Sequence, residues 1–391
     1  MKKIVNMKTE RMKHILFYDD VYVFGGHQVT AIDAVKYLLE NTNINISFIF
    51  YEGNTRLCER LNCMSKNYNR IELYPISFKT PIKYRSFEIL LFYQRIKNIR
   101  SLIRSISPDV VVVVQGYIEL SSPGLIAAKK EGKRTISFIP MAKKISGKGI
   151  KELILNNIQQ YLYRLPDKFI TISTSSKNML LTCGAISDIS VVYCGPDISL
   201  CKIKNREESR IKYGISKEDY ILAIIGRIQF VHKAQDFLVQ TLLDHRQKLK
   251  NIKLYVVGDG PDELQLRKIV QSNNMNDIVT FVPWENDLSY IYSAIDMLVI
   301  PSWYEGLPLV MLEAMYYGLP IIASDVDGMA EVLPNQWLFK CGDSNALIET
   351  FFKVMQADNS EFIFKNNQRI LSEFNVNIFG ENFLEAIENC P

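Results

Sequence analysis

Short apolar runs alternate with amphipathic stretches along most of the chain. Near-continuous runs of Val, Ile and Leu favour strands that are buried on both faces of a parallel sheet. In the first half such runs lie at 14–20, 45–53, 109–116, 135–140, 168–174 and 189–195. Helical patterns lie between them, for example at 31–40 and 123–132. This alternation predicts a doubly wound α/β domain.

A second series of apolar runs follows a polar, Lys- and Glu-rich segment at 195–219. The predicted strands of this series are 219–227, 252–260, 277–283, 296–302 and 319–325, each followed by a helical pattern. We therefore expect two Rossmann-like domains in tandem, covering residues 1–200 and 201–371. The remaining residues, 372–391, have the pattern of an amphipathic helix.

Composition supports two domains and adds a charge asymmetry. The 391 residues suit two domains of ordinary size, and 48% hydrophobic with 23% charged residues is typical of a soluble, core-forming protein. The net charge is +4, but residues 1–200 carry +12 and residues 201–391 carry −8. A basic first half fits an anionic membrane surface or an anionic acceptor. Chance surface composition is the alternative, and no nucleic-acid module is visible.

The cysteines and the start of the chain predict a cytoplasmic protein. Seven cysteines at irregular spacing, with no C-x-x-C pair, argue against a disulfide framework or a structural zinc site. The basic opening lacks the apolar run of a signal peptide, and no apolar stretch reaches the roughly 20 residues that span a bilayer. None of the four histidines is spaced for a metal site; they are His14, His27, His232 and His245.

Two carboxylates in the segment PSWYEGLPLVMLEAM are the strongest chemical signal. Glu305 follows a predicted strand, and Glu313 lies seven intervening residues later in a predicted helix. Pro308 suits the first helical position, and the free N–H groups of that helix start favour a phosphate. Ligands of open α/β sheets bind at this carboxyl edge. The site fits a sugar nucleotide, although Glu313 also suits an ordinary solvated surface position.

This segment, with the following GLPIIASDVDGMAEVL, resembles the donor-site signature of retaining GT-B glycosyltransferases of family 4. The resemblance implies two Rossmann-like domains facing a central cleft, with the last helix returning to the first domain. It also implies that Glu305 contacts the transferred sugar, that Glu313 binds the ribose, and that the turn between them offers backbone amides to the sugar and diphosphate. The matching turn positions are Gly306, Leu307, Pro308 and Leu309.

Two cations belong to the same expected site. Arg227 ends a predicted strand and Lys233 follows six residues later, a spacing that also fits a solvated basic loop. In the resembled family this Arg and Lys hold the donor diphosphate, although Ala234 stands where the family usually has Gly. Gly25 and Gly26 precede a helix expected near Val29, and the resemblance implies that this loop faces the donor phosphates.

Other motifs carry less weight or depart from the family. VVGDGPDEL at 256–264 is an incomplete dinucleotide fingerprint and has a structural role in the family. Trp284 suits either a base stack or a core position, and we expect the core. The first-domain histidine of many family members is absent from 136–144, and His27 is expected to be a helix-start residue.

Together these features predict a retaining, metal-independent glycosyltransferase without a cofactor. Its donor would be a nucleotide-diphosphate sugar. Its acceptor would be a glycan or lipid-linked saccharide, in surface polysaccharide biosynthesis at the inner face of the membrane. Two alternatives stay open: a sugar-nucleotide epimerase on the same fold, and a non-catalytic glycosyltransferase-like binding subunit. The nucleotide base, the sugar and the acceptor linkage are not defined by the sequence.

Overall fold

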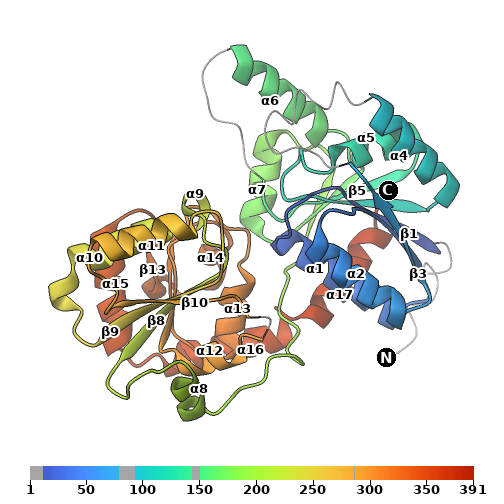
Figure 1. Cartoon of the computed structure of the whole chain (residues 1–391). Coiled ribbons are helices and arrows are strands. Elements are labelled where there is room, and N and C mark those ends of the chain that lie inside the picture. Colours follow the sequence, from blue (N-terminus) through green and yellow to red (C-terminus); the bar gives the residue numbers. More distant parts are fainter. Residues whose placement is uncertain (1–11, 79–92, 143–149, 286) are drawn as a thin grey trace. The chain divides into compact units, whose positions relative to one another are not determined.

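The computed structural model describes residues 12–78, 93–142, 150–285 and 287–391 (Figure 1). The chain divides into two compact units. The first runs to Cys194 and regains Val376–Pro391, and the second is Gly195–Asn375. The boundary at Cys194 precedes the expected residue 200, and the last helix begins at Val376 and not at 372. Within the described part of the chain, no helix is long and apolar enough to span a membrane.

The first unit is built on a parallel sheet with the order β3-β2-β1-β4-β5-β6-β7. Its central strand is the valine run Val110–Val114, in which every side chain is buried. A strand with both faces covered needs apolar residues at successive positions. The strands are β1 His14–Asp19, β2 Asn45–Tyr51, β3 Ile71–Ile76, β4 Val110–Val114, β5 Arg134–Phe138, β6 Lys168–Thr171 and β7 Asp188–Val191.

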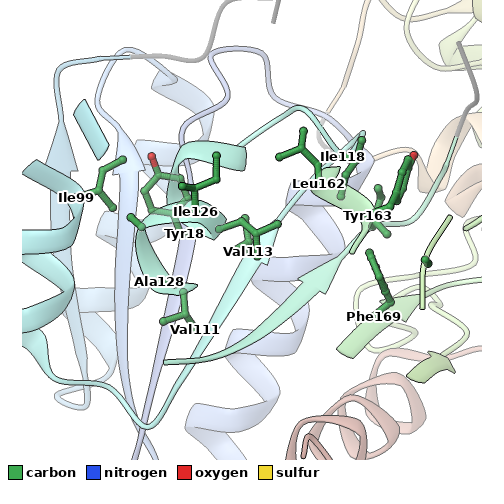
Figure 2. Packing of buried hydrophobic residues seen from close by; sticks show 14 of the residues in the cluster. Tyr18, Ile99, Val111, Val113, Ile118, Ile126, Ala128, Leu162, Tyr163 and Phe169 are labelled. Carbon is green, nitrogen blue, oxygen red and sulfur yellow. The ribbon is translucent and has the colours of Figure 1, made fainter. Parts of the chain in front are cut away.

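Helices between these strands bury one face each against the sheet. Figure 2 shows part of the resulting core, in which Ile126 of α5 lies next to Tyr18 of β1. The helices of this unit are α1 Gly26–Asn41, α2 Thr55–Asn67, α4 Tyr93–Ile106, α5 Ser122–Lys130, α6 Ile150–Tyr163, α7 Thr174–Cys183 and α17 Val376–Glu388.

The last helix completes the first unit. In Figure 1, α17 lies beside α1, although the two come from opposite ends of the chain. Phe383 of α17 packs edge-on against Phe138 at a centroid distance of 5.3 Å and stacks on Phe17 at 6.5 Å. These aromatic contacts fix α17 on the sheet, since buried aromatic pairs add to the free energy of burial.

The second unit has a parallel sheet with the order β10-β9-β8-β11-β12-β13. Its strands are β8 Tyr220–Ile225, β9 Ile252–Val257, β10 Val279–Val282, β11 Met297–Ile300, β12 Ile321–Ser324 and β13 Leu338–Phe339. Its α-helices are α8 Arg206–Lys212, α9 Phe230–Lys233, α10 Gln235–Asp244, α11 Glu263–Ser272, α12 Ser289–Ala294, α13 Leu309–Tyr316, α14 Asp327–Val332, α15 Ser344–Gln356 and α16 Ser360–Ser372. Short 3₁₀ turns cover Arg246–Lys248 and Asn335–Trp337.

The strand order reverses between β8 and β11, which are neighbours in the sheet. Ligands of doubly wound sheets bind outside the carboxyl ends of the strands at such a point. Arg227 lies in the loop after β8, Lys233 ends the short helix α9 that follows it, and Glu305 lies in the loop after β11. The topology therefore brings the predicted cations and the first predicted acid to one edge of one sheet.

The GDGP turn after β9 has a structural role at this edge. A Cβ at Gly258, which has a φ of +134°, would lie 2.2 Å from the carbonyl oxygen of Gly226. A Cβ at Gly260 would lie 2.1 Å from the carbonyl oxygen of Ile228. Asp262 accepts a hydrogen bond from the Phe230 amide at 2.7 Å. The two glycines thus let this turn pack directly on the loop that leads from Arg227 to α9.

Two strands were not predicted. Ile71–Ile76 lies at the edge of the first sheet, contains Pro75 and has only one fully buried side chain, so its pattern is not that of a central strand. Leu338–Phe339 is only two residues long and has no periodicity to detect.

The contact between α17 and α1 yields a stability prediction. A Cβ at Gly380 would lie 2.1 Å from Cγ of Tyr37, so Gly380→Ala requires that the helices separate. We expect the variant to lose about 1–2 kcal/mol, because overpacking outweighs the gain in helix propensity. Thermal unfolding of the full chain measures this loss. The matched control Asn382→Ala lies on the exposed face of the same helix and should leave the melting temperature unchanged. An unaltered melting temperature for Gly380→Ala would contradict the packing.

Candidate donor site of the second unit

Glu305 is the centre of the candidate site. It lies in the loop between β11 and α13, and its side chain is only 7% exposed. Oε1 accepts hydrogen bonds from Lys233 Nζ at 2.5 Å and from Ser302 Oγ at 2.7 Å. Burial alone raises the pKa of Glu305, but Lys233 and His232 outweigh it and lower the pKa to about 2. The buried carboxylate is therefore ionised at neutral pH.

Lys233 is placed by the C-terminus of the short helix α9. Ala234, the next residue, has a φ of +54° and a ψ of 38°, a left-handed conformation. Glycine adopts this conformation without strain, whereas an alanine there costs about 1–2 kcal/mol. Here the turn forms with Ala234 in the left-handed conformation, and Lys233 still contacts Glu305.

Arg227 follows Gly226 at the end of β8 and is exposed. Its carbonyl oxygen accepts a hydrogen bond from Gln235 Nε2 at 2.9 Å, which fixes the backbone. Its guanidinium forms no ion pair with any residue that the structure describes. The site thus has one cation held by an acid and a second whose charge is unpaired, and a guanidinium can bind phosphate oxygens bidentately.

The turn after Glu305 leads directly into α13. Pro308 is the N-cap of this helix and Leu309 its first residue, so Pro308 lies one position before the predicted one. The amides of Gly306 and Leu309 make no hydrogen bond within the described segments. Leu307 and Pro308 between them are buried. Free amides at a helix start carry partial positive charge and favour an anion.

Glu313 has a different environment from Glu305. It lies one turn into α13, and its Oε2 accepts a hydrogen bond from the Tyr292 hydroxyl at 2.5 Å. Tyr292 is buried and stacks on Tyr317 at a centroid distance of 5.0 Å. Burial raises the pKa of Glu313 to about 7, and the Tyr292 hydrogen bond only partly opposes this. The two acids of the motif are therefore poised to titrate far apart.

Two residues of this cluster were missed from the sequence. His232 Nε2 lies 3.6 Å from Glu305 Oε2, and its ring stacks on Tyr304 at 4.5 Å. Asp327 accepts a hydrogen bond from the Glu305 amide at 2.9 Å, with a φ of +47°. A Cβ at the next residue, Gly328, would lie 1.9 Å from the Gly306 carbonyl oxygen. The only signal for His232 in the sequence was its position beside Lys233. The only signal for Asp327 was the Asp-Gly pair, which is typical of a turn.

Trp284, expected in the core, is instead exposed. It follows β10 at the same carboxyl edge, and 41% of its surface is accessible. The prediction was wrong because the strand ends at Val282 and the residues after it are loop. Among the residues that the structure describes, no group of three or more His, Cys, Asp or Glu side chains is placed to hold a metal ion.

Gly25 and Gly26 lie in the first unit, in the loop from β1 to α1. The helix begins at Gly26, three residues before the expected Val29. The Gly25 amide donates to Gln28 Oε1 at 2.9 Å, and Gln28 Nε2 donates to Asp19 Oδ2 at 2.8 Å. A Cβ at Gly26 would meet no atom within 4 Å, so no contact in the described part of this unit requires a glycine there.

His27, the second residue of α1, lies against the end of the central strand β4. Its ring is 3.4 Å from where a Cβ of Gly116 would be. Burial lowers the pKa of His27 to about 4, so the ring is neutral at physiological pH. Its position in the first turn of α1 agrees with the expected helix-start role.

Comparisons with known proteins match both units. Residues 24–200 match the family model "Glycosyltransferase Family 4", and residues 205–370 match "Glycosyl transferases group 1". An "Uncharacterized glycosyltransferase" of Haemophilus influenzae is 25% identical over 307 residues, 76% of each chain. The chain is a glycosyltransferase. It is also 30% identical to a D-inositol 3-phosphate glycosyltransferase of Mycobacterium marinum over 150 residues, which are 36% of this chain and 31% of that protein.

Solved structures agree on the fold. Anabaena Alr3699/HepE, crystallised with UDP and glucose, superposes with a TM-score of 0.78 at 18% identity, over 97% of this chain and 100% of that one. The two parallel-sheet units and this likeness confirm the predicted GT-B fold. The lipopolysaccharide outer core galactosyltransferase WaaB superposes with a TM-score of 0.67 at 21% identity, over 96% of this glycosyltransferase and 99% of WaaB.

The raised pKa of Glu313 predicts a pH dependence of stability. The folded protein protonates Glu313 near pH 7, against 4.5 for an unperturbed Glu, so this group stabilises the fold below pH 4.5 and loses that contribution as pH rises through 7. Glu313→Gln is neutral at every pH. We compare the free energy of unfolding of the wild type with that of Glu313→Gln. As the pH rises from 4.5 through 7, we expect the difference, wild type minus variant, to fall by at most about 3 kcal/mol. Chemical denaturation across the pH range measures it, and a constant difference would contradict the assignment.

Proposed function

We propose that this glycosyltransferase is a retaining, metal-independent enzyme that uses a nucleoside-diphosphate sugar. The observation that carries the proposal is the contact of Lys233 with Glu305 at the edge where Arg227 also lies. A diphosphate needs cations and N–H donors, and a hexose needs a carboxylate acceptor for its hydroxyls. This edge supplies both within one loop cluster.

The diphosphate would bind between Arg227, Lys233 and the start of α13. Cleavage of the bond between the sugar C1 and the phosphate oxygen leaves its electron pair on that oxygen and positive character on the sugar. Arg227, Lys233 and the amides of Gly306 and Leu309 would stabilise the leaving negative charge. Such preorganised donors do the electrostatic work that a metal ion does in other transferases.

The two acids would hold the two sugars of the donor. Glu305, ionised and buried, would accept hydrogen bonds from the transferred sugar, and Glu313 would accept them from the ribose. Tyr292 would hold the Glu313 carboxylate in position. The acceptor hydroxyl oxygen would form the new bond to C1 on the face that the phosphate leaves, and its proton would pass to the leaving phosphate. This route retains the configuration without a separate base.

The neighbours and the charge support one donor class and one acceptor class for testing. The Anabaena protein binds UDP and glucose, which makes UDP-hexoses the first donors to test. WaaB is named for the outer core of lipopolysaccharide, so a saccharide or lipid-linked acceptor of surface polysaccharide biosynthesis is the corresponding acceptor class. The +12 charge of residues 1–200 fits an anionic acceptor or the inner face of an anionic membrane, with the enzyme in the cytoplasm.

Arg227→Ala is the cleanest test, because this cation leaves no buried partner behind. We expect sugar transfer to fall about 100- to 1000-fold with unchanged melting temperature, since one leaving-group donor is lost. Arg246→Ala removes an arginine paired with Asp277 on the surface of the same unit and serves as the control. Full activity of the Arg227→Ala, Lys233→Ala double variant would refute the leaving-group assignment.

Metal removal gives an independent prediction. We expect the rate of transfer to be the same before and after exhaustive treatment with EDTA, because Arg227, Lys233 and the α13 amides neutralise the leaving phosphate. The assay follows release of the nucleoside diphosphate. A loss of activity that added Mg²⁺ or Mn²⁺ restores would contradict the metal-independent mechanism.

A further inference from the structure

The two oxygens of the Glu305 carboxylate have different surroundings. Oε1 accepts from both Lys233 and Ser302. Oε2 faces His232 Nε2 at 3.6 Å, just beyond hydrogen-bond distance. His232 Nε2 is buried and has no hydrogen-bond partner among the described residues. A buried, unsatisfied nitrogen next to a buried carboxylate oxygen is costly unless a small movement joins them.

Binding of a diphosphate creates a conflict for Lys233. The proposed function requires its ammonium group on the phosphate, yet in the structure this group is paired with Glu305 at 2.5 Å. Removal of one partner from a buried ion pair leaves an uncompensated charge, which is strongly unfavourable. The ammonium has three N–H donors, but any of them that turns to the phosphate weakens its hold on Glu305, and a second donor on the carboxylate would compensate for that loss.

His232 is held where that second donor has to be. Its ring lies parallel to Tyr304, at an interplanar angle of 5° and a centroid distance of 4.5 Å. Its backbone carbonyl accepts a hydrogen bond from the Trp303 amide at 2.9 Å. Both contacts attach His232 to the two residues that precede Glu305. These contacts hold the imidazole beside the Glu305 loop, and less than 1 Å separates the present 3.6 Å from a normal hydrogen bond.

We propose that His232 is a positioning residue that replaces Lys233 on Glu305 when Lys233 binds the donor diphosphate. His232 Nε2–H then donates to Glu305 Oε2, Ser302 continues to donate to Oε1, and the carboxylate stays ionised and oriented toward the sugar. This inference rests on the proposed function. It adds that one side chain, adjacent in sequence to the phosphate-binding lysine, couples phosphate binding to the sugar-binding acid.

The test is a double-mutant cycle between positions 232 and 233. His232→Phe keeps an aromatic ring for Tyr304 but removes the donor, His232→Gln restores an N–H donor without the ring, and Lys233→Met removes the ammonium that is exchanged. The probe is whichever of UDP, GDP and ADP the full-length wild type binds most tightly, measured by calorimetry at low salt. His245→Gln is the control, since this histidine bonds the Thr241 carbonyl elsewhere in the second unit.

We expect His232→Phe to weaken binding of the nucleoside diphosphate about 10- to 100-fold, the range for a lost hydrogen bond to a charged group. His232→Gln should restore most of this affinity. In the Lys233→Met background His232→Phe should have almost no effect on binding, because no ammonium leaves Glu305. A purely structural role for the ring would not produce this dependence on Lys233.

Two results would overturn the inference: wild-type affinity for His232→Phe, or an equal loss in both backgrounds, which would indicate a direct or purely structural contact. Failure of the proposed function gives a different result from failure of this inference alone. If the wild type binds none of the three nucleotides, the donor site itself is wrong and the inference falls with it. If wild-type binding depends on Arg227 and not on His232, only the inference is wrong.

Discussion

The carboxylate of Glu305 is buried, and it stays ionised because Lys233 lies against it. Burial alone raises the pKa of Glu305, but Lys233 together with His232 lowers it to about 2, so the acid keeps the charge that makes it a strong acceptor for sugar hydroxyls. The pair in turn requires that the loops after β8 and β11 meet at one edge of the sheet. Three features keep these segments together: the parallel strand order, the glycines of the GDGP turn and the left-handed turn at Ala234.

The two acids of the motif lie in different surroundings. Glu305 has a cation beside it, whereas Glu313 accepts a hydrogen bond from the hydroxyl of Tyr292, and its burial raises its pKa. The pKa of Glu305 thus lies below the usual range of a glutamate, and the pKa of Glu313 lies above it. A permanently charged acid suits a site where positive character develops on the transferred sugar. A weaker acid suits a hydroxyl that only has to be held.

Much of the fold and the centre of the site were predictable because their signals are local. Buried parallel strands such as Val110–Val114 are continuous apolar runs, and Glu305, Pro308 and Glu313 lie in one strand–loop–helix segment. The rest depends on contacts between distant segments. Tyr292 reaches Glu313 across 21 positions, and Asp327 reaches the Glu305 amide across 22. His232 comes close to Glu305 only when α9 folds against the Glu305 loop. The edge strand Ile71–Ile76 contains Pro75 and has only one fully buried side chain, and Leu338–Phe339 is only two residues long.

The central claim is that Lys233, Arg227 and Glu305 form one site for a diphosphate joined to a sugar. A crystal structure of the chain with UDP and a hexose tests it most directly. The account predicts phosphate oxygens within about 3 Å of Lys233 Nζ and of the Arg227 guanidinium, with a sugar hydroxyl at a similar distance from Glu305. A nucleotide bound with its phosphates away from both cations, or a Glu305 that contacts no part of the sugar, would contradict it.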